Sequence, residues 1–244
     1  MRTPHGFSSP FTLSLEIPMP NETPLHVALI PDGNRRWAKA HKLDPWKGHE
    51  KAIENFKEIT QWCRKDPRIS TLTVWCFSTE NWKRNSQEID KLMTMLEEYL
   101  QREREGFQEQ RTRFLHSGRR DRLPSSLVTL IEEVEAETRT NDAFALHLAV
   151  DYGGKDEILR AMHKLKDTKN IDEEILRGAL DHPELPDIDL IVRTSGEQRT
   201  SNFFLWQSTY AEWIFSQKLF PDFRAEDLRR AIEEYSVRAR RFGA

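Results

Sequence analysis

HVALIPDGNRRWAK, residues 26–39, changes character halfway along its length. Its first half is an apolar run, which is typical of a buried β-strand, and its second half opens a helical pattern with two arginines and a tryptophan. The turn DGN, residues 32–34, joins the two halves. Arginines and a glycine turn after a strand indicate a phosphate site, yet Asp32 places a carboxylate at its centre, where it would repel a phosphate.

Outward from this stretch, short β-branched and aromatic runs alternate with longer charged, periodic runs. The predicted strands are Leu25–Ile30, Thr71–Phe77, Arg113–His116, Ala143–Val150, Ile188–Val192 and Trp213–Phe215. The predicted longer helices are Ala52–Arg64, Glu88–Gln110, Pro124–Thr138, Asp156–Lys166, Glu173–Leu180 and Ala225–Arg240. This alternation predicts an α/β fold, a single domain with a mostly parallel six-stranded sheet flanked by helices. We expect the domain over residues 25–244 and a flexible arm, rich in proline and serine, over residues 1–24.

The composition describes a globular protein with a heavily charged surface, since 37% of its 244 residues are hydrophobic and 32% are charged. The formal net charge of -3 gives no case for bulk nucleic-acid binding. No apolar run approaches the roughly 20 residues that a membrane span needs, and the N-terminus does not resemble a secretory signal. The two cysteines, Cys63 and Cys76, lie in apolar runs and are expected to be buried free thiols. Together these features predict a cytosolic protein that can still visit a membrane surface.

Three loops that follow predicted strands carry unusual chemistry, and ligands bind beyond the carboxyl ends of strands in parallel sheets. These loops are residues 31–37, FSTENWKR (77–84) and RTSGEQRTSN (193–202). FSTENWKR mixes polar and large aromatic side chains, which suits a ligand with a charged head and an apolar body, or equally an aromatic-anchored strand end. A fourth loop, DYGGK (151–155), is interpreted as an ordinary glycine turn that opens a helix.

RTSGEQRTSN holds the groups that a diphosphate requires. If the loop curls, the guanidinium groups of Arg193 and Arg199 converge on one point with hydroxyl and backbone N–H donors. The alternative is a polar surface loop with two solvated arginines. Because the loop directly follows the apolar strand IDLIV, we favour the anion site.

Asp32 has two interpretations. Taken alone, it would best be explained as the N-cap of the following helix. However, Gly33 lets the backbone approach a ligand closely, and amides at the start of that helix would point at an anion. A divalent cation between the carboxylate and the phosphate removes the conflict, because Mg²⁺ prefers one or two protein carboxylates together with substrate phosphates. We therefore expect Asp32 to be a magnesium ligand.

Several known motifs are absent from the sequence. It contains no GxxxxGK[ST] phosphate loop, no GxGxxG dinucleotide fingerprint, no HExxH zinc motif and no GxSxG nucleophile elbow. Nor does it contain any Asp-Asp pair, so the DDxxD metal motif of trans-prenyl synthases is missing. His147 lies inside an apolar strand and is expected to be a packed core residue.

Four segments resemble one family closely, the cis-prenyltransferases, of which undecaprenyl diphosphate synthase is the best-known type. They are HVALIPDGNRRWAK, FSTENWKR, DYGGKDEI and IVRTSGEQRTSNFFLWQSTYAEWIFSQKLFPDF, and a closing RARRFG fits too. The resemblance extends from about His26 to Gly243. It implies a homodimeric α/β enzyme with an apolar tunnel, which joins isopentenyl diphosphate to an allylic diphosphate with Mg²⁺ and makes a new cis double bond.

The resemblance also implies roles for individual residues. Asp32 would hold Mg²⁺ on the allylic diphosphate, and Glu212 would reach the metal from a neighbouring segment. The residues that would cradle the allylic diphosphate or line the junction of the two substrates are Gly33, Asn34, Arg35, Arg36, Trp37, His49, Ser78, Thr79, Glu80, Asn81, Trp82 and Arg84. The residues that would bind isopentenyl diphosphate are Arg193, Arg199, Thr200 and Ser201. Asp32, Ser78 and Asn81 are the catalytic candidates, but a neutral amide such as Asn81 is a poor base, so the substrate diphosphate is the alternative proton acceptor.

The sequence departs from the family pattern at four places. Pro45 stands where an arginine is frequent, with Lys47 closer to His49, and Gln198 replaces a common histidine. Cys76 and Phe144 correspond to tunnel positions that usually carry alanine and leucine, and both are larger. Bulk at a tunnel floor stops elongation sooner, so a short or medium product is expected.

Three other functions compete with this one. The first is an atypical family member that uses another acceptor or a branching coupling of allylic diphosphates, for which the changes at Pro45 and Gln198 leave room. The second is a non-catalytic partner subunit on the same fold, although such a protein need not keep Asp32, Glu212 and the arginine pair. The third is RNA binding by the arginine-rich stretches, which is weaker because acidic residues match them.

Overall fold

A single six-stranded sheet organises the protein, for which a computed structural model describes residues 23–238. The strands are β1 (Leu25–Ile30), β2 (Ile69–Ser78), β3 (Thr112–Ser117), β4 (Phe144–Tyr152), β5 (Leu190–Arg193) and β6 (Glu212–Phe215). Their order is β3-β4-β2-β1-β5-β6, and every neighbouring pair is parallel. The predicted fold class is therefore confirmed. The arm predicted over residues 1–24 and the closing RARRFG fall almost wholly outside the described residues.

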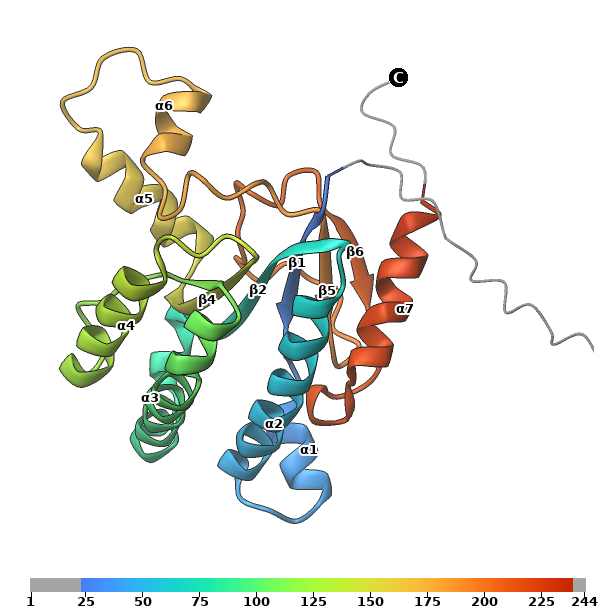
Figure 1. The fold of residues 1–244 in the computed structure, drawn as a ribbon. Helices are drawn as coiled ribbons and strands as arrows, with labels where there is room; N and C mark the ends of the chain where they lie inside the picture. Colours follow the sequence, from blue (N-terminus) through green and yellow to red (C-terminus); the bar gives the residue numbers. More distant parts are fainter. Residues whose placement is uncertain (1–22, 239–244) are drawn as a thin grey trace, which may run out of the picture.

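Seven α-helices and two short 3₁₀ helices connect the strands (Figure 1) within the described part of the chain. The α-helices are α1 (Asn34–Ala40), α2 (Pro45–Lys65), α3 (Ser86–Glu109), α4 (Ser125–Thr138), α5 (Gly154–Lys164), α6 (Glu173–Gly178) and α7 (Ala225–Ser236), and the 3₁₀ helices are η1 (Thr79–Lys83) and η2 (Phe220–Asp222). Helix α2 begins before the predicted Ala52, because Pro45 occupies its first turn, where a missing N–H costs nothing. Its first two turns are mostly polar and include Gly48, so they lacked the apolar periodicity on which the prediction depended.

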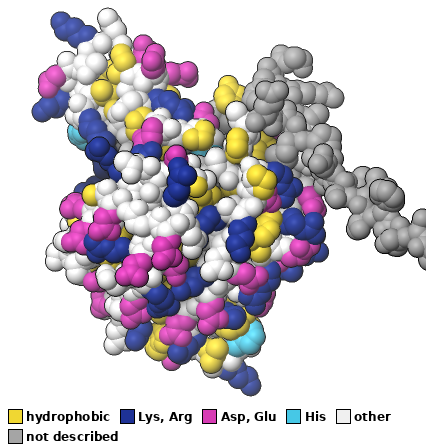
Figure 2. Space-filling model, in the orientation of Figure 1, with side chains coloured by type: hydrophobic (Ala, Val, Ile, Leu, Met, Phe, Trp, Pro, Cys, Tyr) yellow, Lys and Arg dark blue, Asp and Glu magenta, His cyan; other side chains and the backbone are white. Residues whose placement is uncertain are grey.

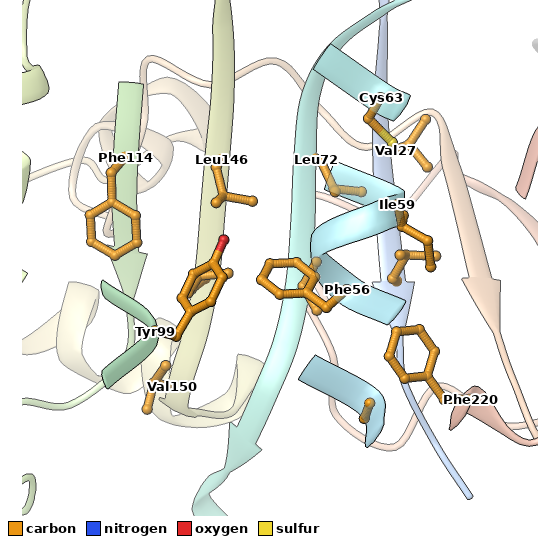
Figure 3. Packing of buried hydrophobic residues seen from close by; sticks show 14 of the residues in the cluster. Val27, Phe56, Ile59, Cys63, Leu72, Tyr99, Phe114, Leu146, Val150 and Phe220 are labelled. Carbon is orange, nitrogen blue, oxygen red and sulfur yellow. The ribbon is translucent and has the colours of Figure 1, made fainter. Parts of the chain in front are cut away.

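The main core lies between one face of the sheet and helices α2, α3, α4 and α7. Alternate strand residues face this layer, because successive side chains of a strand point to opposite sides. Figure 3 shows Val27, Leu72, Leu146 and Phe114 on four neighbouring strands, with Phe56 of α2 packed against them. Each of the five is at most 7% exposed, so this layer supplies most of the apolar burial that holds the sheet to its helices.

The other face of the sheet carries a row of hydrogen-bonded polar side chains that crosses four strands. His26 of β1 shares a hydrogen bond of 2.7 Å between its Nε2 and Thr73 Oγ1, and Thr73 in turn lies 3.0 Å from His147 Nδ1. His147 Nε2 lies 2.8 Å from Ser117 Oγ of β3. All four side chains are buried, and the row satisfies them without water. The prediction that His147 is a packed core residue is confirmed.

The surface mixes charges of both signs. On the face seen in Figure 2, acidic and basic side chains lie interspersed, with small hydrophobic areas between them. No helix within residues 23–238 is long and apolar enough to cross a membrane. Both cysteines are free: Cys63 is buried and Cys76 is half-buried.

We expect acid to destabilise the fold through its buried histidines. Burial lowers the pKa of His26 and His147 below the usual value and that of His116 to about 3. Each of these histidines therefore takes up a proton on unfolding between its folded pKa and 6.5, so the free energy of unfolding falls as pH falls below 6.5, by about 1.4 kcal/mol per pH unit for each group. Urea unfolding at pH 7.5, 6.5 and 5.5 measures this slope.

The variant His116→Gln tests how much His116 contributes to this pH dependence of the free energy of unfolding. A glutamine amide can still donate to the Val150 carbonyl, which lies 3.1 Å from His116 Nε2, but it does not titrate. Below pH 6.5, we expect the free energy of unfolding of this variant to fall less steeply with pH than that of the wild type, by about 1.4 kcal/mol per pH unit. An unchanged slope contradicts the assignment to His116.

Candidate active site

A cleft of ≈ 540 Å³ opens at the carboxyl ends of β1, β2 and β5, where the three unusual loops meet. Its walls are formed by Ile30, Pro31, Asp32, Gly33, Asn34, Arg35, Arg36, His49, Trp75, Cys76, Phe77, Ser78, Glu80, Asn81, Arg84, Arg193, Ser201 and Asn202. The parallel sheet brings these residues together from segments that are far apart in sequence, because the carboxyl ends of its strands lie at one edge.

Asp32 and Arg193 form an ion pair at the carboxyl ends of β1 and β5. Arg193 Nη2 donates to Asp32 Oδ2 at 3.0 Å, and the backbone N–H of Gly33 donates to the other carboxylate oxygen at 2.8 Å. The pair exists because the ends of β1 and β5 lie in register, with Ile30 beside Arg193. Thr194 and Phe220 donate to the carbonyl of Asp32 at 2.7 and 3.0 Å, which fixes its backbone.

The structure answers the question of the N-cap. The residue that caps α1 is Gly33, whose φ of 104° lies in the left-handed region that glycine tolerates. Glycine has no side chain that could cap the helix, and at the start of α1 the Asp32 carboxylate accepts only from the N–H of Gly33. The Asp32 carboxylate therefore does not cap α1. One third of the Asp32 side chain, 34%, remains exposed on the cleft wall.

The two arginines of RTSGEQRTSN do not converge as expected. Arg193 is 4% exposed, and its Nη1 donates to Ser201 Oγ at 2.8 Å and to the Arg199 carbonyl. The Arg199 side chain is instead 58% exposed and pairs with Glu197, and Thr200 is exposed as well. The reason is the left-handed backbone at Ser195 and Gly196, which turns the middle of the loop outward. Arg193 and Ser201 line the cleft, whereas Arg199 and Thr200 do not.

Arg36 adds a second basic group to the same side. Its guanidinium donates to Ser195 Oγ at 2.5 Å and lies 3.2 Å from Glu197. The start of α1 is thus tied to the loop after β5. Trp37, in contrast, points away from the cleft, since its Nε1 donates to Asp222 at 2.9 Å and its ring stacks on His41.

The loop FSTENWKR is held by its own hydrogen bonds. Ser78 ends β2 and caps η1, because its side chain accepts from the N–H of Asn81 while Asn81 Oδ1 accepts from the Ser78 N–H at 3.1 Å. Trp82 Nε1 donates to Asp151 at 2.8 Å, and the Trp82 ring packs edge-on against Phe77. Asp151 is fully buried. Its charge is balanced by Arg122, which donates to both carboxylate oxygens.

The glycine pair of DYGGK has the structural role expected for it, because it lets two other loops come close. A Cβ on Gly153 would lie 2.7 Å from Thr79 Oγ1 and 2.8 Å from Asn202 Nδ2. The N–H of Gly154 donates to the Asn202 carbonyl at 2.7 Å. Thr79 is thereby placed beside this turn, outside the cleft lining, while Asn202 donates to Glu80 at 3.3 Å on the cleft wall.

Three polar atoms on the cleft wall have no hydrogen-bond partner. They are Asn34 Oδ1, His49 Nε2 and Arg193 Nε, all of them buried. Unsatisfied buried polar atoms are rare in folded proteins, and each needs an explanation. These three atoms are available to a polar ligand in the cleft.

Glu212 and Asp32, the two expected metal ligands, are not brought together within the chain. Glu212 is the first residue of β6 and lies in register with Leu190, the first residue of β5. Asp32 follows the last residue of β1, so the two carboxylates lie toward opposite ends of the parallel strands. Glu212 pairs instead with Arg238 at 2.8 Å. The described residues contain no cluster of three acidic, histidine or cysteine side chains that could hold a metal ion by itself.

A separate apolar cavity of ≈ 80 Å³ lies beside the cleft, between β2 and helices α2 and α3. The two share Pro31, Asn34, His49 and Cys76 as wall residues, so they are adjacent. Phe56 and Tyr99, whose ring centroids are 5.1 Å apart, belong to the cavity wall. Phe144, expected to line a tunnel, is a buried core residue that is not part of this wall.

The departures at Pro45 and Gln198 lie outside the cleft lining. Pro45 starts α2, Lys47 pairs with Glu50 at 2.7 Å, and Gln198 is exposed. Sequence reasoning assigned no role to two residues near the loops, Asn202 and Glu88. Asn202 ends the quoted RTSGEQRTSN motif, which was its only signal. Glu88 resembles an ordinary acid in the first turn of a helix, and only the tertiary structure buries it at the cleft.

Comparison with known proteins places this site in context. The family model described as "Putative undecaprenyl diphosphate synthase" matches residues 30–243. An isoprenyl transferase of Treponema pallidum is 43% identical over 89% of this chain and 98% of its own length. A tritrans,polycis-undecaprenyl-diphosphate synthase (geranylgeranyl-diphosphate specific) of Pyrococcus horikoshii is 42% identical over 90% of this chain and 87% of its own length. The crystal structure of lavandulyl diphosphate synthase from Lavandula x intermedia with dimethylallyl diphosphate superimposes with a TM-score of 0.86, at 36% identity, over 91% of this chain and 99% of that one.

We expect Gly48→Ala to disturb the cleft. Gly48 lies where α2 crosses α1, and a Cβ there would come within 2.0 Å of the Asn34 carbonyl oxygen. Because this contact is backbone, α1 must shift and carry Asn34 and Arg35 with it. The affinity for inorganic pyrophosphate, measured by titration calorimetry, should fall about tenfold or more. Gly178→Ala is the matched control, since a Cβ at Gly178 meets nothing within 4 Å. Equal affinities in the two variants would contradict this assignment.

Proposed function

Because the chain belongs to the family of putative undecaprenyl diphosphate synthases and is a prenyl transferase, we propose that it joins isopentenyl diphosphate to an allylic diphosphate with a new cis double bond. The observation that carries the proposal is the contact between a charged cleft and an apolar cavity, which share four wall residues. A prenyl diphosphate has the same two parts, a diphosphate head and an apolar tail, and would occupy both at once.

The residues of the cleft fit a magnesium ion carried by the substrate. Asp32 offers a partly exposed carboxylate, and Asn34 Oδ1 is an oxygen donor without a partner in the same wall. Mg²⁺ prefers one or two carboxylates plus substrate phosphates, so a single carboxylate suffices. Asp32 would hold the ion, and the bound ion would neutralise charge on the diphosphate. Glu212 is not assigned to this ion within the chain.

The reaction breaks the allylic C–O bond, so negative charge grows on the departing diphosphate and positive charge on the allyl group. Arg35, Arg36 and Arg84 line the cleft and would donate to the departing oxygens. Arg193 and Ser201 would bind the second diphosphate. The aromatic rings of Trp75 and Phe77 on the cleft wall would keep water from the cation.

The proton lost from isopentenyl diphosphate would go to the substrate diphosphate. Asn81 is the family's usual candidate, but its Oδ1 already accepts from the Ser78 N–H at 3.1 Å. A neutral amide committed to that bond is better suited to orienting a substrate than to removing a proton. We therefore assign Asn81 and Ser78 to positioning the junction of the two substrates.

We further propose that the product is short or medium in length and that the protein is a homodimer. We also propose that it is cytoplasmic and contacts membranes through its lipid product. The small size of the apolar cavity, ≈ 80 Å³, supports a product of limited length. Leu159 and Met162, one helical turn apart on α5, are 58% and 53% exposed. Such an apolar stripe on a helix supports burial against a second copy of the chain.

The second candidate function is a branching coupling of two allylic diphosphates. The observation in its favour is the likeness to lavandulyl diphosphate synthase, whose crystal structure holds dimethylallyl diphosphate, an allylic compound. The purified protein should be incubated with labelled isopentenyl diphosphate and separate allylic primers, and in a second series with the allylic primers alone. Cis-linked product that requires isopentenyl diphosphate supports the first function. Branched product from the allylic primers alone supports the second.

Asp32→Asn should lower the rate of prenyl transfer by a factor of about 10² to 10³ or more, because it removes the metal's charged ligand and keeps the side-chain shape. The measurement is incorporation of labelled isopentenyl diphosphate with Mg²⁺. Asp44→Asn serves as the control, since Asp44 is exposed before α2 and makes no side-chain capping bond. Full activity of Asp32→Asn would defeat the metal assignment.

Tyr99→Ala should lengthen the product. The Tyr99 and Phe56 rings line the apolar cavity, so removing one ring would enlarge it. Chromatography of the dephosphorylated products should show the wild type making chains of fewer than about ten isoprene units and the variant making longer ones. Phe144→Leu, outside the cavity wall, is the matched control. A wild-type product of mainly ten or more units would refute the proposed length.

A further inference from the structure

Glu88 lies at the point where three segments of the cleft wall meet. It occupies the first turn of α3, after the N-cap Asn85, and its side chain is 6% exposed. Its Oε1 lies 3.5 Å from Arg84 Nη1, 3.7 Å from Arg35 Nε and 3.7 Å from His49 Nε2. These three partners come from the loop before α3, from α1 and from α2, and all three line the cleft.

Glu88 holds these groups without using up their donors. Its Oε1 makes no hydrogen bond, and within residues 23–238 the side chains of Arg35 and Arg84 make ion pairs with Glu88 but no hydrogen bond. Arg193 differs, because its Nη1 and Nη2 donate to Asp32, Ser201 and a backbone carbonyl. Arg35 and Arg84 therefore keep their guanidinium donors for a ligand, with a buried counter-charge behind them.

A buried carboxylate in this position is costly unless cations balance it. His49 lowers the pKa of Glu88 below its usual value, burial opposes this, and Arg35 and Arg84 lower it further. The dependence is mutual. Without the carboxylate, two guanidinium groups and an imidazole would crowd one corner of the cleft, and the two long, flexible arginine side chains would spread into solvent.

We propose that Glu88 is a positioning residue of the prenyl transfer reaction, which fixes Arg35, Arg84 and His49 in the cleft wall and acts on the departing diphosphate through them. This inference rests on the proposed function. Glu88 itself touches no substrate in this role.

The role predicts a change in kcat rather than in KM. Removing the carboxylate removes a repulsion of the diphosphate and also the fixed placement of its donors, and these two changes offset one another in ground-state binding. The placement counts fully in the transition state, where charge grows on the departing oxygens.

The test is Glu88→Gln, which keeps the shape of the side chain and removes its charge. We expect kcat to fall about ten- to hundredfold, while KM for the allylic diphosphate and the affinity for inorganic pyrophosphate change less than about threefold. Glu103→Gln is the matched control, because Glu103 lies on the same helix, pairs with Lys57 at 2.8 Å and is outside the cleft lining. Its kinetic constants should equal those of the wild type.

Two further variants separate positioning from folding. In an Arg84→Gln background, Glu88→Gln should lower kcat by a smaller factor than in the wild type, because part of its effect passes through Arg84. Glu88→Asp keeps the charge one methylene farther away, so its kcat should lie between those of the wild type and Glu88→Gln at unchanged KM. This variant decides the question if the glutamine variant does not fold.

The outcomes distinguish this inference from the function on which it rests. An active wild type with an unchanged kcat in Glu88→Gln, or in Glu88→Asp where that variant decides, overturns the positioning role alone. A fall of kcat together with a large rise of KM and a lower melting temperature also overturns it, in favour of a structural role. A wild type without prenyl transfer under any primer overturns the proposed function, and the role of Glu88 with it.

Discussion

The ion pair between Asp32 and Arg193 joins the two halves of the cleft, and its existence depends on the register of the sheet. Strands β1 and β5 are parallel neighbours, with Ile30 beside Arg193, so the residues that follow them emerge together. Arg193 is nearly fully buried and needs a counter-charge, which Asp32 supplies at 3.0 Å. The carboxylate that seemed misplaced in a phosphate site therefore has a partner before any ligand arrives, and an incoming metal or diphosphate would rearrange an existing balance of charge.

Counter-charges behind arginines recur around this cleft. Arg193 has Asp32, Arg36 has Glu197, and Arg84 has Glu88. Beside the loop FSTENWKR, Asp151 is buried between Arg122 and Trp82, and through Trp82 it holds the loop that carries Asn81. Without these carboxylates, the guanidinium groups around the cleft would repel one another. Pairing each of these cations with a carboxylate balances its charge and keeps it near the cleft.

The two faces of the sheet differ in polarity. The face toward α2 and α3 is apolar and contains the cavity that Phe56 and Tyr99 help to line. The opposite face carries the histidine and threonine row, which is fully hydrogen-bonded across β1, β2, β4 and β3. The apolar cavity therefore lies on the first face, and an apolar ligand could not replace the hydrogen bonds of the second.

The sequence by itself determined the strands, most of the helices, the parallel sheet and the three loops that form the cleft. These depend on local periodicity and on the rule that parallel strands end at one edge, and Asp32, Arg84 and Ser201 were found in this way. Only the tertiary structure decided which members of a loop face inward. Arg199 turns out to solvent because the backbone before it is left-handed, and Glu212 begins a strand whose far end reaches the cleft edge. The sequence could not predict the burial of Glu88 or the place of Tyr99 in the cavity wall for the same reason, since each depends on how α3 packs against residues more than thirty positions away.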